Sequence, residues 1–599
     1  MKDNKLRLAK FTYLPIIFFI AITPLIIRGV LIEYPTFDIF WLSNDTMRYD
    51  FANYYKMRFI MFTGFFAFVN YIYLLFTEKV KFKKEPINFM LLGLSFFIII
   101  SAVLSEYREV ATLGYYTRYE NMYVYLSYFF MAFYTKEVLR TKKEFNLVIY
   151  SFLASTFVFS TIGILQYFSK DPLRQGFLGQ LLIPKELVDT ITLEDLNFRF
   201  PEGRSFATLF NPNYVGTYVS VAVMFLISFL FESKHYIKRI LIVIASSLLV
   251  FTLIGASSRA GLIAIAVTGV FFLILKIPVI RKDIKKISVI LLIGILAFAA
   301  LQTNRGIAYK DKLMSGLNFE QRELPALKGY ETKENAIEMT LGEDIFTFRL
   351  QHEEINSVAL YEGEEKIDMF FDGKIYYFKE PRLEKITLKY GRVSKQNTNE
   401  SYVQIANDGL SYSFALLKDG VHFLYKNKAL GTMSTADHIE SWSGYGRVGS
   451  GRIFIWSRSI PQIISKYAFI GAGVDVYPLV YPQDDYVAKR FDFTNETIII
   501  DKPHNMYILY AYNGGLIFLL LFMAMNGYVI FKILKNKKED DWYRLLTNSI
   551  VLGIIAYLSV GMINDSTVGT APVYWIILGM GMALMKKAEE NKKTKFIKK

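Results

Sequence analysis

The chain has no cysteine among its 599 residues. Disulfide bonds, thiolate nucleophiles and cysteine-ligated metal sites are therefore excluded. Only five histidines are present, and no cluster of His, Asp and Glu has the spacing of a metal site. Neither a Walker A motif nor a GxGxxG motif that opens a βαβ unit is found. We therefore expect no metal, no cofactor and no nucleotide-dependent chemistry.

Charged residues are also scarce, at 21% of the chain, whereas soluble domains usually carry about 25%. Hydrophobic residues make up 53% and aromatic residues 16%. The apolar residues gather in runs of about 17–25, the length of a helix that spans a bilayer. This pattern excludes a soluble enzyme, a disordered scaffold and a fibrous repeat protein. No small-residue cleavage site follows the first run, so we interpret it as a retained helix.

These runs predict an α-helical polytopic membrane protein with about twelve spanning helices. The predicted spans are 11–33, 59–77, 88–105, 121–135, 146–167, 212–231, 240–256, 259–275, 287–302, 506–531, 546–562 and 568–585.

The formal net charge of +15 would suit nucleic-acid binding if the basic residues formed one patch. Instead, seven stretches beside the spans hold 32 Lys and Arg against 12 Asp and Glu, which leaves the remainder at −5. These stretches are 1–10, 78–87, 136–145, 232–239, 276–286, 532–545 and 586–599. The positive-inside rule makes them cytoplasmic. We therefore predict a multi-pass protein of the cytoplasmic membrane with both termini inside, a large extracellular loop and no nucleic-acid partner.

The outward segment 303–505 is too long for a connection and must contain a folded unit. Short β-branched and aromatic runs, several of them separated by Asp-Gly turns, indicate antiparallel strands. These runs are 346–350, 357–361, 366–371, 375–378, 385–390, 402–405, 411–417 and 421–425. We interpret 318–437 as an extracytoplasmic β-sandwich inserted between helices 9 and 10, and 443–505 as a lid. Residues 1–310 then hold helices 1–9, and 506–599 hold helices 10–12 and a cytoplasmic tail.

Ionisable groups at the outer ends of membrane helices are candidate site residues, because charge that faces lipid is costly. The first such string, 203–207, includes Arg204 and precedes Asn211-Pro212-Asn213 at the start of the sixth span. Asn211 can cap that helix, and Pro212 suits its first turn. Capping alone and a polar role in substrate contact both remain open for the two asparagines.

Arg259 lies at the outer entry to the eighth span, directly after Ser257 and Ser258 in a very short turn. Its side chain cannot extend far into bulk solvent, so we expect it to point into an aqueous cavity. A guanidinium suits bidentate contact with phosphate. An interfacial anchor is the alternative.

A second arginine, Arg452, lies one turn before Trp456 on a predicted outer helix. A glycine-rich turn from Gly471 ends in the carboxylate of Asp475. A surface ion pair would explain Arg452 alone, but it would not explain the whole string.

The fourth string, 501–507, stands at the mouth of the tenth span and contains His504, Asn505 and Tyr507. Pro503 starts a helix there and places the imidazole at the outer membrane face. An imidazole can take a proton from a hydroxyl near pH 7. The other four histidines are expected in a cytoplasmic stretch or in the β insert and its exit, which leaves His504 as the candidate base.

In this order, the strings resemble the O-antigen ligase superfamily, which also contains bacterial surface-glycan polymerases and protein O-oligosaccharyltransferases. The resemblance covers helices 3–12 and includes the segments 105–114, 118–120, 206–213, 258–261, 451–456, 471–475, 481–485 and 501–507. It implies a GT-C-type membrane glycosyltransferase that takes a glycan from an undecaprenyl (polyprenyl) diphosphate carrier without a metal. Matching positions make His504 the essential histidine, with Arg259 and Arg452 as functional arginines. The β-sandwich departs from the usual, mainly helical loop of the family and leaves the acceptor open.

The residues suit these implied roles. A diphosphate leaving group needs preorganised cations, which Arg259 and Arg452 can supply. His504 is the best-placed base, and Asp475 or Asp501 could orient it. The predicted substrate-binding residues are Arg204, Asn211, Asn213, Asp475, Asn505 and Tyr507.

The expected partners are a polyprenyl-diphosphate-linked glycan donor, a glycan, lipid or protein acceptor, and membrane lipid. Ligation to an acceptor and polymerisation of repeat units use the same chemistry and are not separated by the sequence. A polysaccharide transporter or flippase is one alternative, although no inverted repeat is evident. A membrane-anchored glycan-binding receptor is another, although twelve helices exceed what anchoring needs.

Overall fold

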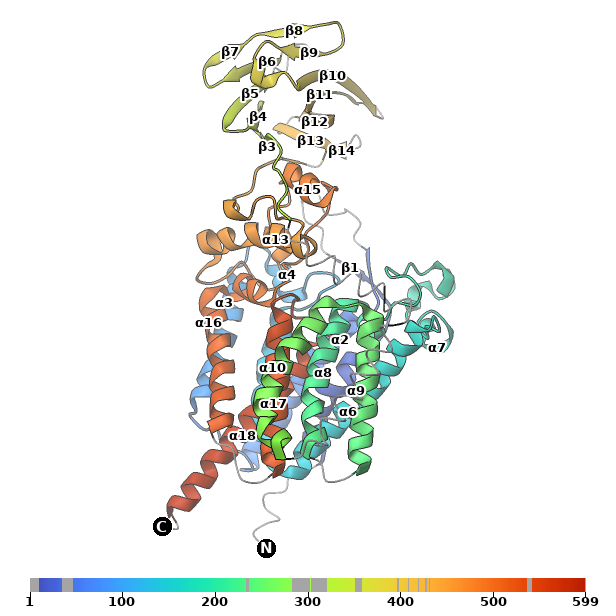
Figure 1. Ribbon diagram of the computed structural model, residues 1–599, viewed down its shortest axis with the longest axis vertical. Helices are drawn as coiled ribbons and strands as arrows, with labels where there is room; N and C mark the ends of the chain where they lie inside the picture. Colours follow the sequence, from blue (N-terminus) through green and yellow to red (C-terminus); the bar gives the residue numbers. More distant parts are fainter. Residues whose placement is uncertain are drawn as a thin grey trace.

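The structure, a computed structural model, describes residues 10–34, 47–232, 236–282, 320–350, 358–395, 398–407, 409–417, 420–425, 428–429, 431–535 and 541–597, with Gln302 and Ile307 as single residues. Helices form an elongated body, and the β strands gather at one end of it, beyond α13 (Val448–Gln462) and α15 (Tyr486–Phe493) (Figure 1). The last helix, α18 (Ala571–Ile597), ends at the opposite end (Figure 1).

Seven of the described helices are long and apolar enough to cross a membrane. They are α2 (Asn53–Phe76), α3 (Pro86–Leu104), α6 (Lys142–Tyr167), α8 (Pro212–Glu232), α9 (Tyr236–Ala256), α16 (Met506–Lys535) and α17 (Asp541–Gly561). Shorter apolar segments lie at Lys10–Leu25, in α10 (Arg259–Lys282) and in α18. The chain is therefore a helical, membrane-associated protein. The predicted span 287–302 lies outside the described residues except for Gln302, and the count of twelve stays a prediction.

The helices divide into a central and a peripheral set. In α8 and α17, 83% and 78% of the spanning window is buried, against 39% in α2 and in α3. α8 packs against α17, α9 and α10, so it lies at the centre of the bundle. The peripheral helices expose large apolar side chains such as Phe65 and Phe89, as expected of a face that meets lipid.

Local signals explain where several helices begin. Pro86 and Pro212 occupy the first position of α3 and α8, where a missing N–H costs nothing. Asn121 caps α5 (Met122–Val138) by accepting a hydrogen bond from the backbone N–H of Val124 at 3.0 Å. Thr141 and Glu144 form a capping box at the start of α6.

The first predicted span, 11–33, is wrong at its end. The helical segment stops at Leu25, after short turns of 3-10, α and π type, and α1 is only Leu14–Ile17. Pro15 and Pro24 remove two backbone donors, which explains the broken helix. The β-branched stretch that follows forms β1 (Val30–Glu33), which pairs antiparallel with β2 (Met47–Asp50).

Segments predicted on the same side of the membrane do meet one another. Lys136 donates to Glu85 at 2.6 Å and Lys586 pairs with Glu137, which joins three of the stretches predicted to be cytoplasmic. The ring of Trp542, from a fourth such stretch, lies 5.2 Å from the ammonium nitrogen of Lys142. The described parts of these four basic stretches therefore lie together in the fold.

Two antiparallel sheets form the predicted β-rich insert. One has the order β3-β4-β5-β6-β7 and the other β14-β13-β12-β11-β10-β9-β8. Their strands are β3 (Leu327–Thr332), β4 (Ala336–Leu341), β5 (Asp344–Leu350), β6 (Val358–Glu362), β7 (Glu365–Ile367), β8 (Met369–Phe371), β9 (Tyr376–Phe378), β10 (Ile386–Lys395), β11 (Thr398–Asn407), β12 (Leu410–Leu417), β13 (Gly420–Tyr425) and β14 (Lys428–Ala429). Both sheets contribute to one apolar core, in which Tyr330 meets Phe414 and Phe348 meets Phe378.

The strand prediction differs from the structure in three details, and the first is that the short strand β14 was not predicted. The run 366–371 is not one strand, because the chain changes sheet at Asp368, between β7 and β8. β3 and β4 were not predicted, since their exposed faces carry polar residues that dilute the apolar signal. Leu327, Tyr330, Ile337 and Met339 nevertheless fill the core from these two strands.

The lid contains α13, α14 (Tyr477–Val480) and α15. Tyr486 and Val487 of α15 belong to the apolar core of the β unit, so the lid and the β unit are packed together. α13 begins with Gly449, Ser450 and Gly451 in left-handed backbone, a sharp turn that sets the direction of the helix proper.

Candidate functional site

The loop 562–566, between α17 and α18, connects most of the predicted site residues. Asn505 donates from its backbone N–H to Oδ1 of Asp565 at 3.1 Å and from Nδ2 to the carbonyl of Met562 at 3.1 Å. Asn564 donates from Nδ2 to the carbonyl of Asn213 and to Oγ1 of Thr217, both at 3.0 Å. The loop thereby joins the start of α16 to the start of α8.

His504 faces a carboxylate of this loop. Its Nδ1 lies 3.4 Å from Oδ2 of Asp565, and the two side chains are 30% and 1% exposed. That buried Oδ2 makes no hydrogen bond within geometric limits in the described part of the chain, and the imidazole of His504 is its ion-pair contact. The pairing leaves Nε2 as the ring nitrogen that can serve a substrate.

The backbone holds His504 in a defined position. His504 has φ +52°, an uncommon left-handed conformation for a non-glycine residue. The next residue, Asn505, caps α16 by accepting from the N–H groups of Tyr507 and Ile508 at 2.9 and 3.1 Å. The left-handed turn therefore places His504 outside the regular helix, and the cap at Asn505 fixes the start of α16.

Asp565 stays ionised despite its burial. Burial alone would raise its pKa, but the contact with His504 and the charges of Arg118 and Lys502 hold the pKa below its ordinary value. A buried carboxylate that remains charged can stabilise an imidazolium beside it.

Lys502 is a further cation at the mouth of α16. Its Nζ lies 3.1 Å from Oδ2 of Asp501 and donates to the hydroxyl of Tyr214 at 3.1 Å. Burial opposes the charged form, but Asp501 outweighs it and raises the pKa of Lys502. Lys502 and His504 likewise hold the pKa of Asp501 below its ordinary value against the effect of burial. Asp501 thus pairs with Lys502, while Asp565 is the carboxylate next to His504.

Arg452 is attached to the same loop. Its Nε donates to the carbonyl of Ile563 at 3.0 Å and its Nη1 to the carbonyl of Gly449 at 2.7 Å. Burial lowers the pKa of Arg452, the nearby Asp565 raises it and the nearby Arg259 lowers it. An arginine remains charged after such a shift. Arg452 therefore lies within electrostatic reach of both Arg259 and Asp565.

Close packing brings Arg259 to this place. It is the first residue of α10 and follows Ser257, which has φ +51°. A Cβ at Gly216 of α8 would lie only 2.0 Å from Oγ of Ser258, so the glycine lets the two helices approach. Ala260 packs in one cluster with Ile563, the residue whose carbonyl holds Arg452.

Asn211, directly before α8, and Asn213, the second residue of α8, are mainly structural in their contacts. Oδ1 of Asn211 accepts from the N–H of Asn213 at 2.9 Å, and its carbonyl accepts from Tyr214 and Val215. The capping role is confirmed, and substrate contact stays a prediction. Tyr507 donates its hydroxyl to the carbonyl of Leu558 at 2.7 Å, which ties α16 to α17.

Asp475 is fully buried and has three donors. It accepts from Nε of Arg118 at 2.7 Å and from the N–H groups of Tyr115 and Glu120 at 2.8 and 3.1 Å. These contacts fix the loop after α4 (Arg108–Leu113), so we assign Asp475 to the framework of the site. The sequence suggested that Asp475 could orient His504. The contacts of Asp475 are instead with Arg118 and the loop after α4.

Glu120 connects that framework to the loop 562–566. Its Oε1 accepts from Ser566 at 2.7 Å and from Tyr128 at 3.1 Å. Burial raises its pKa to about 7, although Ser566 and Arg118 oppose the shift.

Arg204 lies apart from the group around His504. Its guanidinium is 5.2 Å from the centre of the Phe200 ring, in the segment before α8, and burial lowers its pKa. No contact in the described part of the chain links it to His504, and its substrate role stays a prediction.

Sequence reasoning did not single out Asp565 and Ser566. It included Lys502, Arg118 and Glu120 in the family-like segments but gave them no role in the site. A usable signal was present, because Asn564-Asp565-Ser566 places three polar residues in a short gap between two apolar helices. The pairing of Asp565 with His504 could not be predicted from the sequence, because 60 residues that form two helices separate them.

Among the described residues, no three His, Asp or Glu side chains converge as metal ligands would. Comparison with protein-family models, with curated proteins and with solved structures finds no match for this chain.

Proposed function

We propose that the protein is a membrane glycosyltransferase of GT-C-like fold that moves a glycan from a polyprenyl diphosphate carrier to an acceptor hydroxyl. The observation that carries the proposal is one loop that presents Asp565 to His504 and also holds Arg452 through the carbonyl of Ile563. A histidine base with a buried carboxylate partner, beside fixed guanidinium groups, suits a hydroxyl nucleophile and a diphosphate leaving group.

The proposed reaction is a direct displacement. The acceptor oxygen bonds to the anomeric carbon while the bond from that carbon to the diphosphate oxygen breaks. The hydroxyl proton passes to Nε2 of His504, and Asp565 stabilises the resulting imidazolium through Nδ1. The electron pair of the broken bond leaves with the diphosphate, and the product has inverted configuration.

The cations have a matching role. Arg259 and Arg452 would bind the diphosphate oxygens, where charge grows in the transition state. Lys502 adds a third positive charge close by, held by Asp501 and Tyr214. Fixed positive groups of this kind can act without a divalent ion.

An outer-face reaction at the cytoplasmic membrane, with the β unit outside and both termini inside, is part of the proposal. The contacts among four of the basic stretches support it, because the positive-inside rule places such stretches in the cytoplasm. Such an O-antigen ligase-like enzyme would either ligate a glycan to a lipid, protein or glycan acceptor or polymerise repeat units of a surface polysaccharide. The donor lipid would lie among the membrane helices.

Transfer of a labelled oligosaccharide from undecaprenyl diphosphate, by purified protein in proteoliposomes, tests the proposal. Wild type and a His422→Ala control should transfer the label and release the carrier, because His422 lies on β13. His504→Ala should lose the reaction. Equal carrier release by all three proteins would contradict the role of His504.

The alternatives give different outcomes in the same vesicles. A flippase would move the labelled donor across the bilayer without cleaving it. A glycan-binding receptor would retain the glycan with no turnover. Either result would replace the transferase proposal.

A further inference from the structure

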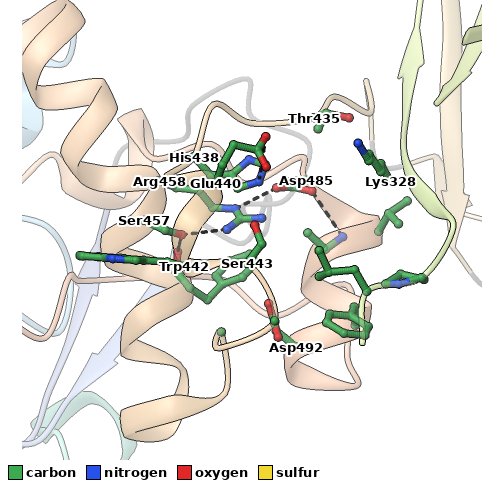
Figure 2. A pocket seen from close by; sticks show the side chains of 18 of the residues that line it. Lys328, Thr435, His438, Glu440, Trp442, Ser443, Ser457, Arg458, Asp485 and Asp492 are labelled. Carbon is green, nitrogen blue, oxygen red and sulfur yellow. Dashed lines mark hydrogen bonds and ion pairs between the residues drawn. The ribbon is translucent and has the colours of Figure 1, made fainter. Parts of the chain in front are cut away.

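A cavity of about 200 Å³ lies where the β unit meets the lid (Figure 2). Its walls come from the segment 324–328 around the start of β3, from the exit segment 435–446, from α13 and from α15. This volume far exceeds the roughly 10–15 Å³ that one water needs and falls below the roughly 300 Å³ of the smallest drug-sized pockets. The cavity therefore fits one small ring.

Helix α13 separates this cavity from His504. Arg452 and Trp456 lie one turn apart on the face that contacts Ile563 and Pro503. The opposite face of the helix, about 140–240° around its axis from Arg452, carries Phe454, Ser457 and Arg458. These three side chains line the cavity. A helix is about 10 Å across, so a ligand in the cavity would lie roughly that far from the candidate site.

The cavity contains polar atoms that the protein itself does not satisfy. Oδ1 of Asp492 and Oγ1 of Thr435 are buried and make no hydrogen bond within the described part of the chain. A buried polar atom without a partner is costly, so a ligand hydroxyl that turns either side chain toward the cavity would be bound favourably. Gly446 allows this arrangement, because a Cβ there would lie 2.0 Å from Oδ2 of Asp492.

The remaining lining resembles that of a carbohydrate site. Arg458 donates from Nε to Asp485 at 2.9 Å, and both side chains are at least nine-tenths buried (Figure 2). Trp442 supplies aromatic surface, and Arg458 and Arg322 stack on the rings of Phe454 and Phe491, 3.7 and 4.0 Å from the ring centres. A pyranose ring has hydroxyls around its rim and C–H groups on its faces, so it can use both kinds of contact.

The charge of the lining selects among sugars. Arg458 and Asp485 neutralise each other, which leaves Lys328 against Glu440 and Asp492. Arg322 and Arg447 also act electrostatically on Asp492, so the charges around the cavity nearly balance and do not favour a charged ligand. A neutral sugar residue is favoured.

We propose that this cavity is a saccharide subsite that holds one neutral sugar residue of the acceptor glycan, about one helix width from the hydroxyl that reacts. The assignment of the bound sugar to the acceptor glycan rests on the proposed function, whereas sugar binding by the cavity does not. In this proposal the β unit has a role in acceptor binding, because it supplies one wall of the subsite and positions the acceptor chain over the lid.

Saturation-transfer NMR on the full-length protein in detergent tests the subsite, with methyl glycosides of neutral, N-acetylated and uronic-acid hexoses as probes. Neutral or N-acetylated glycosides should bind, and Asp492→Asn should weaken binding by about tenfold, the value of one hydrogen bond to a charged group. Gly446→Ala should weaken it too, because the new methyl group displaces the carboxylate.

Matched controls separate this proposal from the transferase mechanism. Asp437→Asn removes an exposed carboxylate outside the cavity lining and should bind the glycosides as wild type does. His504→Ala should also bind normally. Glycoside binding by a wild-type protein that transfers no glycan would contradict only the proposed function. Equal binding by wild type, Asp492→Asn and Gly446→Ala would overturn the subsite, and so would absent binding of neutral glycosides or a preference for uronic acids.

Discussion

Arg452 donates from Nε to the carbonyl of Ile563 at 3.0 Å, two residues before the carboxylate that faces His504. This bond joins the lid to the loop between α17 and α18. A candidate anion-binding group and a candidate base are thus fixed by one short segment.

Removing the charge of Asp565 should greatly lower the rate of glycan transfer, while the protein still folds. Asp565→Asn keeps the size of the side chain and an oxygen for the N–H of Asn505, but it cannot stabilise an imidazolium. We expect the turnover rate to fall by about 100-fold or more. The measurement is initial transfer rate at saturating donor, with Asp437→Asn as the control, and an unchanged rate would remove Asp565 from the mechanism.

Arg452→Lys should lose activity although it keeps the positive charge. The guanidinium makes two bonds in different directions, to Ile563 and Gly449, which one ammonium cannot reproduce. We expect a loss of about tenfold or more in transfer rate. Arg447→Lys, an exposed change on the same segment, is the control. Full activity in Arg452→Lys would show that charge alone is sufficient.

Breaking the buried pair of Arg118 and Asp475 should destabilise the protein strongly. Arg118→Met leaves Asp475 without its ion partner, which costs about 3–5 kcal/mol at buried pairs. Thermal unfolding in detergent should show a large fall in midpoint. Lys379→Met breaks an exposed pair with Asp368 and should leave the midpoint unchanged. Similar midpoints for wild type and Arg118→Met would contradict the framework role of Asp475.

Glu120 should make the stability depend on pH. Because its pKa is raised from 4.5 to about 7 in the fold, its contribution is fully present below pH 4.5 and is lost as pH rises through about 7. The loss should reach about 3 kcal/mol at alkaline pH. Glu120→Gln should unfold at a higher temperature than wild type at pH 8, with a much smaller difference at pH 5. Exposed Glu109→Gln should match wild type at both values, and a Glu120→Gln variant that also does so would refute the raised pKa.

Helix positions could be predicted from the sequence where the signal is local. Apolar runs, Pro86, Pro212 and the cap at Asn211 all act within a few residues, and the structure has helices there. The first span failed because two prolines and a β-branched stretch competed with its apolar character. Strands β3 and β4 were not predicted, because only one face of each strand is apolar.

The candidate site was partly predictable for the same reason. His504, Arg259 and Arg452 stand in short polar strings at helix ends, which a sequence displays directly. The partners Asp565 for His504 and Arg118 for Asp475 are set by the packing of α16, α17 and α5, which brings distant loops together. The cavity beside Asp492 depends on contact between the β unit and the lid, so no local pattern could indicate it.

The most direct test is a double-variant cycle on the single-turnover rate of glycan transfer. His504→Ala, Asp565→Asn and the double variant would be compared with wild type on undecaprenyl-diphosphate oligosaccharide. Because Asp565 acts through His504, the double variant should be no slower than His504→Ala. Transfer at the wild-type rate by His504→Ala, or losses that multiply in the double variant, would contradict the account.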